Sequence, residues 1–168
     1  MSKLDKNVSQ ENYYDYISEL DNNTKDVLKE TIATASKSFS ITNPNDGKTI
    51  ASEARIWIDK ILETGTFPEE YESLDEVCIA LGALYGHSLN ISYGWSWEVF
   101  GKTEEDSMCG VVSPEKNFCN PSFNYIYSIL IGSNYGSDAK RENTVLLSYN
   151  MMSDIDKKPM HLKYYPIL

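Results

Sequence analysis

Residues 73–94 read SLDEVCIALGALYGHSLNISYG, the longest helical pattern in the chain. The first four residues have the S-x-x-E form of a capping box, in which two side chains bond the N–H groups exposed at a helix start. The apolar side chains that follow recur at helical spacing, namely Leu74, Val77, Cys78, Leu81, Leu84, Tyr85 and Leu89. Gly94 ends the pattern. We expect this helix to be the central packing element of the fold.

Two glycines lie on one side of this helix, at Gly82 and Gly86. Each costs about 1 kcal/mol of helix stability relative to alanine, so a compensating contact is expected. A glycine admits the close approach of another backbone. We predict that the sheet, or the helix of residues 49–64, packs here, and we favour this structural role over a ligand site.

Three earlier segments also carry helical spacing, and a loop separates the last two. The predicted helices cover 10–21, 24–37 and 49–64, and the loop is the Asn-Pro-Asn-Asp-Gly run at 43–47. In the second helix the expected buried stripe is Val27, Leu28, Ile32 and Ala35.

The period changes after Gly94. Apolar and polar residues alternate over 95–100, which indicates a half-buried strand, and further strands are predicted at 108–112 and 117–120. Pro114 lies in the turn between the last two, and Pro121 suits the first position of a helix that runs to Gly132. A final helix is predicted over 140–152.

The predicted fold class is α+β. N-terminal helices precede a small three-stranded antiparallel meander, C-terminal helices follow, and helices from both flanks cover a single layer of sheet. We expect one domain over 1–168, with residues 1–8 as a frayed leader.

The composition is that of an acidic globular protein. The 168 residues include 15 Lys and Arg against 25 Asp and Glu, for a net charge of −10. This balance argues against nucleic acid and anionic membrane surfaces as partners, because both require a basic surface. No secretory signal and no membrane-spanning stretch is readable, so we expect a cytoplasmic protein whose three cysteines are reduced.

The excess charge is concentrated in the middle of the chain. Residues 51–120 hold 4 basic and 13 acidic residues, for −9, whereas the segments on either side are close to neutral. A concentrated patch of one sign can steer a partner of the opposite sign.

No catalytic constellation stands out. The two histidines, His87 and His161, have no second ligand at helical spacing, so no metal site or cofactor is predicted. A cysteine hydrolase that uses Cys109 or Cys119 with His87 is an open alternative, and a cross-strand disulfide between these two cysteines is conceivable. The paired carboxylates lie in loops and a first helical turn, where solvated positions are expected.

A resemblance to a known family indicates more about function than the residues do alone. The carrying motifs are Leu81-Gly82-Ala83-Leu84-Tyr85-Gly86 followed by Trp97, Gly110-Val111-Val112-Ser113-Pro114, Asn120-Pro121, and then Phe123, Tyr127 and Gly132. With these motifs the chain resembles a bacterial family of uncharacterised domains, similar to immunity proteins encoded beside polymorphic or secretion-system toxins. The resemblance spans 49–135 and brings no catalytic residue. The chain departs from the pattern after the second helix glycine, where His87 replaces an acidic or polar residue.

The resemblance implies a non-enzymatic protein that neutralises a cognate toxin or effector by occluding an active site, which we expect to be basic. The expected partner-binding residues are Glu69, Glu70, Tyr71, Glu72, Trp95, Glu98, Glu104, Glu105 and Asp106. The expected structural residues are Gly82, Gly86, Trp97, Pro114 and Pro121. Two further alternatives remain open at this point, an acidic nucleic-acid mimic and a scaffold or dimerisation module.

Overall fold

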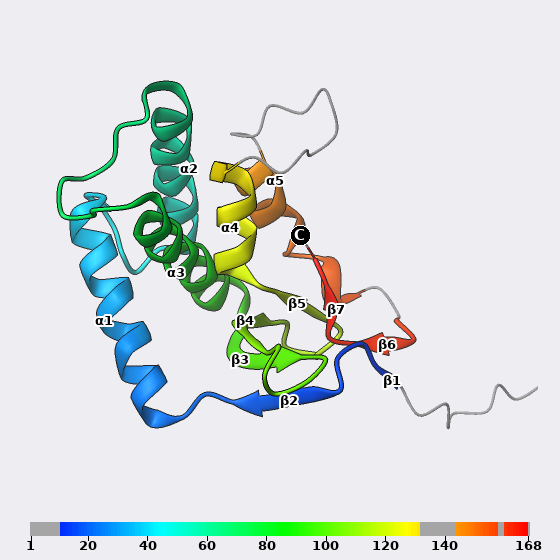
Figure 1. The fold of residues 1–168 in the computed structure, drawn as a ribbon. Coiled ribbons are helices and arrows are strands. Elements are labelled where there is room, and N and C mark those ends of the chain that lie inside the picture. Colours follow the sequence, from blue (N-terminus) through cyan, green and yellow to red (C-terminus); the bar gives the residue numbers. More distant parts are fainter. Residues whose placement is uncertain (1–10, 132–143, 158–159, 168) are drawn as a thin grey trace, which may run out of the picture.

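The computed structural model describes residues 11–131, 144–157 and 160–167. Its elements, in chain order, are β1 (Glu11–Asn12), β2 (Tyr16–Glu19), α1 (Asn22–Ser38), α2 (Gly47–Thr64), α3 (Leu74–Tyr93), β3 (Ser96–Gly101), β4 (Met108–Val112), β5 (Phe118–Asn120), α4 (Ser122–Ile131), α5 (Thr144–Met151), the 3₁₀ helix η2 (Ile155–Lys157), β6 (Leu162–Lys163) and β7 (Tyr165–Pro166). Figure 1 shows the helices gathered on one side of a small sheet.

Helix α3 is the central packing element, as predicted. It packs against α1, α2 and α4, and most of its side chains from Val77 to Leu89 are buried. Ser73 is the N-cap and accepts a hydrogen bond from the backbone N–H of Glu76 at 3.3 Å. The Glu76 carboxylate caps the N–H of Glu72 (2.7 Å), one residue before the partner that a capping box uses. Gly94 ends the helix in the left-handed conformation, with φ at +69°.

The two α3 glycines admit neighbours that any side chain would displace. A Cβ on Gly82 would lie 2.8 Å from the Cα of Phe123, and one on Gly86 would lie 2.3 Å from the Trp97 ring. The close approach therefore comes from the first turn of α4 and from β3, not from the helix predicted over 49–64. Pro121 is buried directly before α4, and its carbonyl accepts the N–H of Tyr125 at 2.9 Å.

Helices α1 and α2 start earlier than predicted. Asp21 and Asp46 are the N-caps of α1 and α2, because their carboxylates accept the N–H groups of Thr24 (2.7 Å) and Thr49 (3.0 Å). Hydrogen bonds from the Thr24 N–H to Asp21, and from the Thr49 hydroxyl and N–H to Asp46, hold the pKa of both carboxyls below the usual value. Of the helix predicted over 140–152, residues 140–143 lie outside the described residues.

The first predicted helix, over residues 10–21, is wrong where the structure describes it. Residues 11–12 and 16–19 are strands, and β2 pairs antiparallel with β3. Tyr14 is buried and stacks on Phe100, with ring centroids 5.3 Å apart. The run of Tyr and Ile residues suits a strand, and pairing with β3 overrides the local helical spacing.

The sheet has five strands in the order β2-β3-β4-β5-β7, so the three-stranded meander is incomplete as a prediction. The predicted strands are its middle three. Segments from near both chain ends complete it, since β2 adds one edge and β7 adds the other, parallel to β5. A second, two-stranded sheet pairs β1 with β6.

The two faces of the sheet are covered differently. Side chains alternate between faces, and Val111 and Phe118 join the main core under α3 and α4. Phe100, Val112 and Cys119 point to the opposite face, where Tyr14 and Tyr164 from the chain ends cover them. Within the described residues no helix has the length and apolar character needed to span a membrane.

Candidate functional site

Six of the acidic residues expected to bind a partner are exposed, and they lie in two segments of the chain. Glu69, Glu70 and Glu72 are exposed in the link between α2 and α3. Glu104, Glu105 and Asp106 are exposed at the tip of the β3–β4 hairpin. Hydrogen bonds inside the hairpin loop order it, from the Asp106 N–H to Thr103 Oγ1 (3.2 Å) and from Ser107 Oγ to the Glu104 carbonyl (2.7 Å).

A groove of about 380 Å³ runs between α1 and α3 beside the first acidic segment. Its apolar residues include Val27 and Ile79, which are 55% and 51% exposed. Carboxylates border it on every element that forms it. The full lining is Val27, Glu30, Thr31, Thr34, Glu70, Tyr71, Glu76, Ile79 and Ala80.

A second hollow, of about 250 Å³, lies between α3 and α4 and shares Ile79 with the groove. Its other lining residues are Asp75, Cys78, Phe123, Asn124 and Tyr127. The Asn124 amide contacts the Met108 sulfur at 3.8 Å, and Met108 begins the strand that leaves the acidic hairpin. The groove, the second hollow and the hairpin are therefore neighbours.

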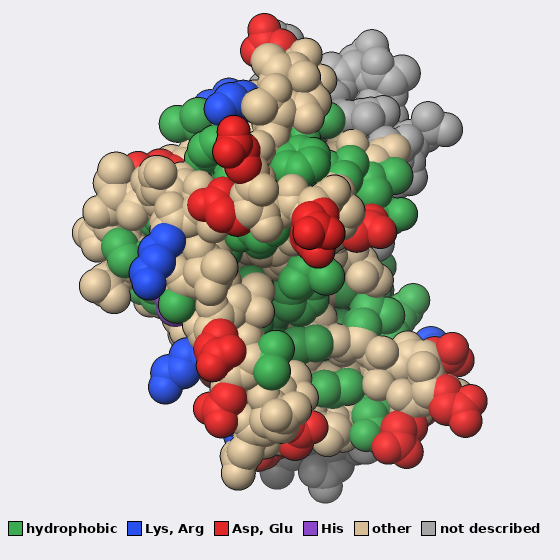
Figure 2. Space-filling model, turned by 60° about the vertical axis from the view of Figure 1, so that its left-hand side comes forward, with side chains coloured by type: hydrophobic (Ala, Val, Ile, Leu, Met, Phe, Trp, Pro, Cys, Tyr) green, Lys and Arg blue, Asp and Glu red, His purple; other side chains and the backbone are tan. Residues whose placement is uncertain are grey.

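Figure 2 brings the α1 side of the molecule forward. Hydrophobic side chains gather in its middle, with acidic side chains above and below them. We call this surface, made of the two hollows and the two acidic segments, the acidic face.

Two of the expected partner-binding residues are not on the surface. Trp95 is 1% exposed and belongs to the main core. Glu98 is 8% exposed, and its carboxylate bonds Lys116, Ser96 and Tyr164. Both expectations are wrong for a physical reason, since segments distant in the sequence cover β3. Tyr71 is half-buried and stacks on Phe39 at 5.5 Å, so only part of it faces the groove.

The cysteine and histidine residues do not form a reactive pair. Cys109 and Cys119 point to opposite faces of the sheet, because Val112, three residues after Cys109, is the residue opposite Cys119. All three cysteines are free. Burial raises the pKa of the Cys109 thiol to about 11 and that of Cys119 to about 12, which disfavours the thiolate. The His87 ring, whose pKa burial lowers, bonds the Pro44 carbonyl instead.

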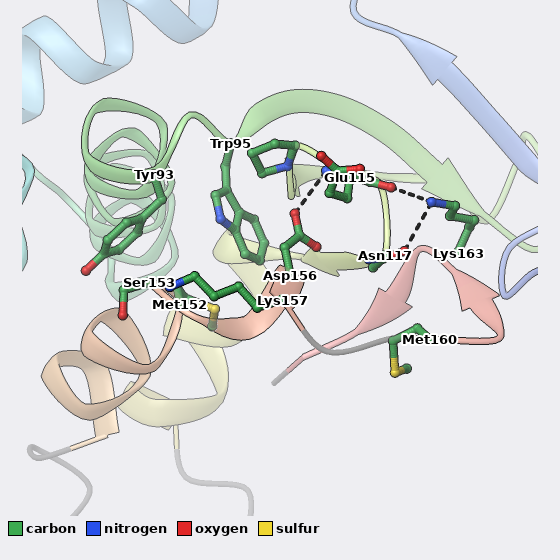
Figure 3. Close-up of a pocket in the computed structure, with 11 residues that line it drawn as sticks. Tyr93, Trp95, Glu115, Asn117, Met152, Ser153, Asp156, Lys157, Met160 and Lys163 are labelled. Carbon is green, nitrogen blue, oxygen red and sulfur yellow. Dashed lines mark hydrogen bonds between the residues drawn. The ribbon is translucent and has the colours of Figure 1, made fainter.

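A third hollow, of about 790 Å³, lies elsewhere, between the end of α3, the β4–β5 turn and the C-terminal segment. Figure 3 shows Asp156 pointing toward the turn and Lys163 reaching the same turn from β6. Asp156 accepts from Ser113 Oγ (2.7 Å) and from the Glu115 N–H (2.9 Å). Lys163 donates to Asn117 (3.1 Å), and Lys157 pairs with Asp154.

Of the four charged side chains that line this hollow, three already bind other groups of the protein, namely Asp156, Lys157 and Lys163. Pro114 lies exposed at its rim, in the turn. We therefore interpret the hollow as the place where the C-terminal segment packs against the β4–β5 turn of the sheet. No group of three His, Cys, Asp or Glu side chains in the described ranges is arranged to hold a metal ion.

We predict that Asp156→Ala lowers the free energy of unfolding by about 1–3 kcal/mol, because it leaves Ser113 Oγ and the Glu115 N–H without their acceptor. Urea titration measures the change. The matched control is Asp154→Ala, which removes an exposed carboxylate whose ion pair with Lys157 is solvated. Equal shifts in the two variants would contradict the assigned role of Asp156.

Sequence reasoning missed the apolar part of the acidic face. The sequence pattern predicts that Val27 belongs to a buried stripe, yet Val27 is 55% exposed and lines the groove. Ile79 lies off the predicted α3 stripe, and an apolar residue outside the stripe of a buried helix is the signal that could have identified it.

Comparisons with protein-family models, curated proteins and solved structures find no match.

Proposed function

We propose that this protein is a non-enzymatic, immunity-type binding protein that neutralises a cognate bacterial toxin or effector by occluding its active site. The observation that carries the proposal is the acidic face, where two apolar hollows lie between two exposed acidic segments. The resemblance to immunity proteins motivates the choice of partner class.

An exposed apolar groove and an acidic surface contribute differently to binding. Apolar side chains that leave water on association supply most of the affinity, and aromatic or aliphatic anchors in pockets are typical of binding hot spots. Exposed charges mainly raise the association rate and select the sign of the partner. An inhibitor of this kind is suited to a toxin whose active site is basic, as in enzymes that bind nucleic acid or nucleotides.

The direct test uses the product of the adjacent gene as the probe. We expect binding in calorimetry at low salt, and we expect co-expression to restore growth when that product alone is toxic. Absence of binding and of growth rescue would overturn the proposed function.

We predict that the triple change Glu104→Gln, Glu105→Gln and Asp106→Asn slows association with that probe about tenfold at low salt. The reason is that the three carboxylates are exposed and unpaired with any cation in the described part of the chain. Stopped-flow fluorescence at two salt concentrations measures the rate, and the difference should shrink as salt screens the charges.

A matched control removes three negative charges at positions outside the acidic face. Glu11, Glu63 and Glu115 are exposed and line neither hollow of the acidic face. Their triple change to Gln should slow association much less. If both triples slow it equally, only the net charge matters and the hairpin has no special role.

A further inference from the structure

We infer that the acidic face binds a basic amphipathic helix of the partner, seated in the α1–α3 groove with an apolar side chain on each side of Ile79. This inference rests on the proposed function and specifies the chemistry of the segment that the partner inserts. It follows from the shape of the two hollows, the exposed apolar residues in them and the charge around them.

The shape favours a helical segment. The first hollow lies between two helices, α1 and α3, and the second lies between α3 and α4. Grooves between helices accept amphipathic helices whose apolar residues recur at i, i+3, i+4 and i+7. Ile79 belongs to both hollows and separates them. Successive apolar residues of one helix can therefore occupy the two hollows, with Ile79 between them.

The apolar surface is exposed on helices that are otherwise packed. Val27, Ile79 and Tyr127 come from α1, α3 and α4 and are 55%, 51% and 46% exposed. Covering these side chains removes apolar surface from water at roughly 25 cal/mol per Å². Because Ile79 is at the centre and is flanked by both hollows, we expect it to be the main hot spot.

The charge around the hollows selects a basic occupant. Glu30, Glu70 and Glu76 border the first hollow, and Asp75 borders the second. No ion pair among the described residues involves any of these carboxylates. No Lys or Arg lines either hollow. Lysine or arginine side chains on the flanks of a docked helix would pair with these carboxylates, whereas an acidic helix would be repelled.

The test uses a defined probe, a capped peptide of about 18 residues, or five helical turns. It carries Leu at i, i+3, i+4 and i+7 and Lys at the other positions. Fluorescence anisotropy measures its affinity for the full-length protein. A second peptide with Glu in place of each Lys is the charge control, and we expect it not to bind.

The groove is tested with a matched pair of isoleucines. Ile79→Ala should raise the Kd of the Lys peptide about tenfold. Ile56→Ala is the control, because Ile56 is also an exposed isoleucine on a helix, at 60%, and lines neither hollow. Glu70→Gln should weaken binding at low salt, and Glu63→Gln, at an exposed carboxylate of α2, should not. Circular dichroism confirms that each variant folds.

The outcomes separate this inference from the proposed function. Failure of the Lys peptide to bind, equal binding of the Glu peptide, or equal effects of Ile79→Ala and Ile56→Ala would each overturn the inferred helix site. If the product of the adjacent gene binds but its affinity does not change in Ile79→Ala, the proposed function stands and the inferred helix site is wrong. If that product fails to bind while the Lys peptide docks at Ile79, the groove stands and the proposed function fails.

Discussion

Trp95→Ala should lower the free energy of unfolding by about 3–5 kcal/mol, the range for a large aromatic side chain removed from a core. Trp95 is among the largest fully buried side chains and joins the end of α3 to the sheet. Its carbonyl also accepts the Asn90 amide at 2.7 Å, which ties the helix end to the start of β3. Urea unfolding followed by circular dichroism measures the loss.

Tyr127→Ala is the control for this prediction, because Tyr127 is an aromatic residue of the same chain that is 46% exposed. Its removal should shift the unfolding midpoint only slightly. Trp95→Phe, which keeps most of the buried volume, should fall between the two. If Trp95→Ala left stability unchanged but reduced partner binding, Trp95 would be a surface anchor and its buried position would be wrong.

The second large effect is expected at Gly110, in the middle of β4. A Cβ there would lie 2.4 Å from the Asn120 carbonyl oxygen, 2.7 Å from the Phe100 ring and 3.0 Å from the Cα of Pro121. Two of these neighbours are backbone, so a side chain must force β4 and β5 apart. We predict that Gly110→Ala costs about 1–3 kcal/mol by overpacking, and that Gly110→Val costs more.

Cys109→Ala provides the comparison on the same strand, since it removes atoms from a half-buried position and adds none. It should cost less than Gly110→Ala in the same urea titration. A Gly110→Ala protein as stable as the Cys109→Ala protein would show that the two strands can separate without loss.

Prediction from sequence succeeded where one local signal and one burial pattern agree. Ser73 and Gly94 mark the two ends of α3, and the residues of the predicted apolar stripe from Val77 to Leu89 are buried. The cap and the glycine act within one turn, so local chemistry was sufficient. The three middle strands also lie close to where the sequence predicts them, and the side chains of β4 and β5 enter the cores on both faces of the sheet.

Prediction failed where distant segments meet. Residues 11–19 carry apolar side chains at helical steps, yet 16–19 form a strand on the open edge of β3 and 11–12 pair with β6. For Glu98 the decisive neighbours are Lys116 and Tyr164, which are 18 and 66 residues away. No local pattern contains such contacts.

Part of the candidate site could likewise be predicted from the sequence, and part could not. The chain itself locates the negative charge, since 13 acidic residues against 4 basic ones fall in residues 51–120 wherever they fold. Only the tertiary structure decides that Glu70 borders a groove in which Val27 and Ile79 lie exposed, and that Met108, close to the hairpin of Glu104–Asp106, contacts Asn124 at the second hollow. Charge is a property of each residue, whereas a groove exists only once α1, α3 and α4 are packed side by side.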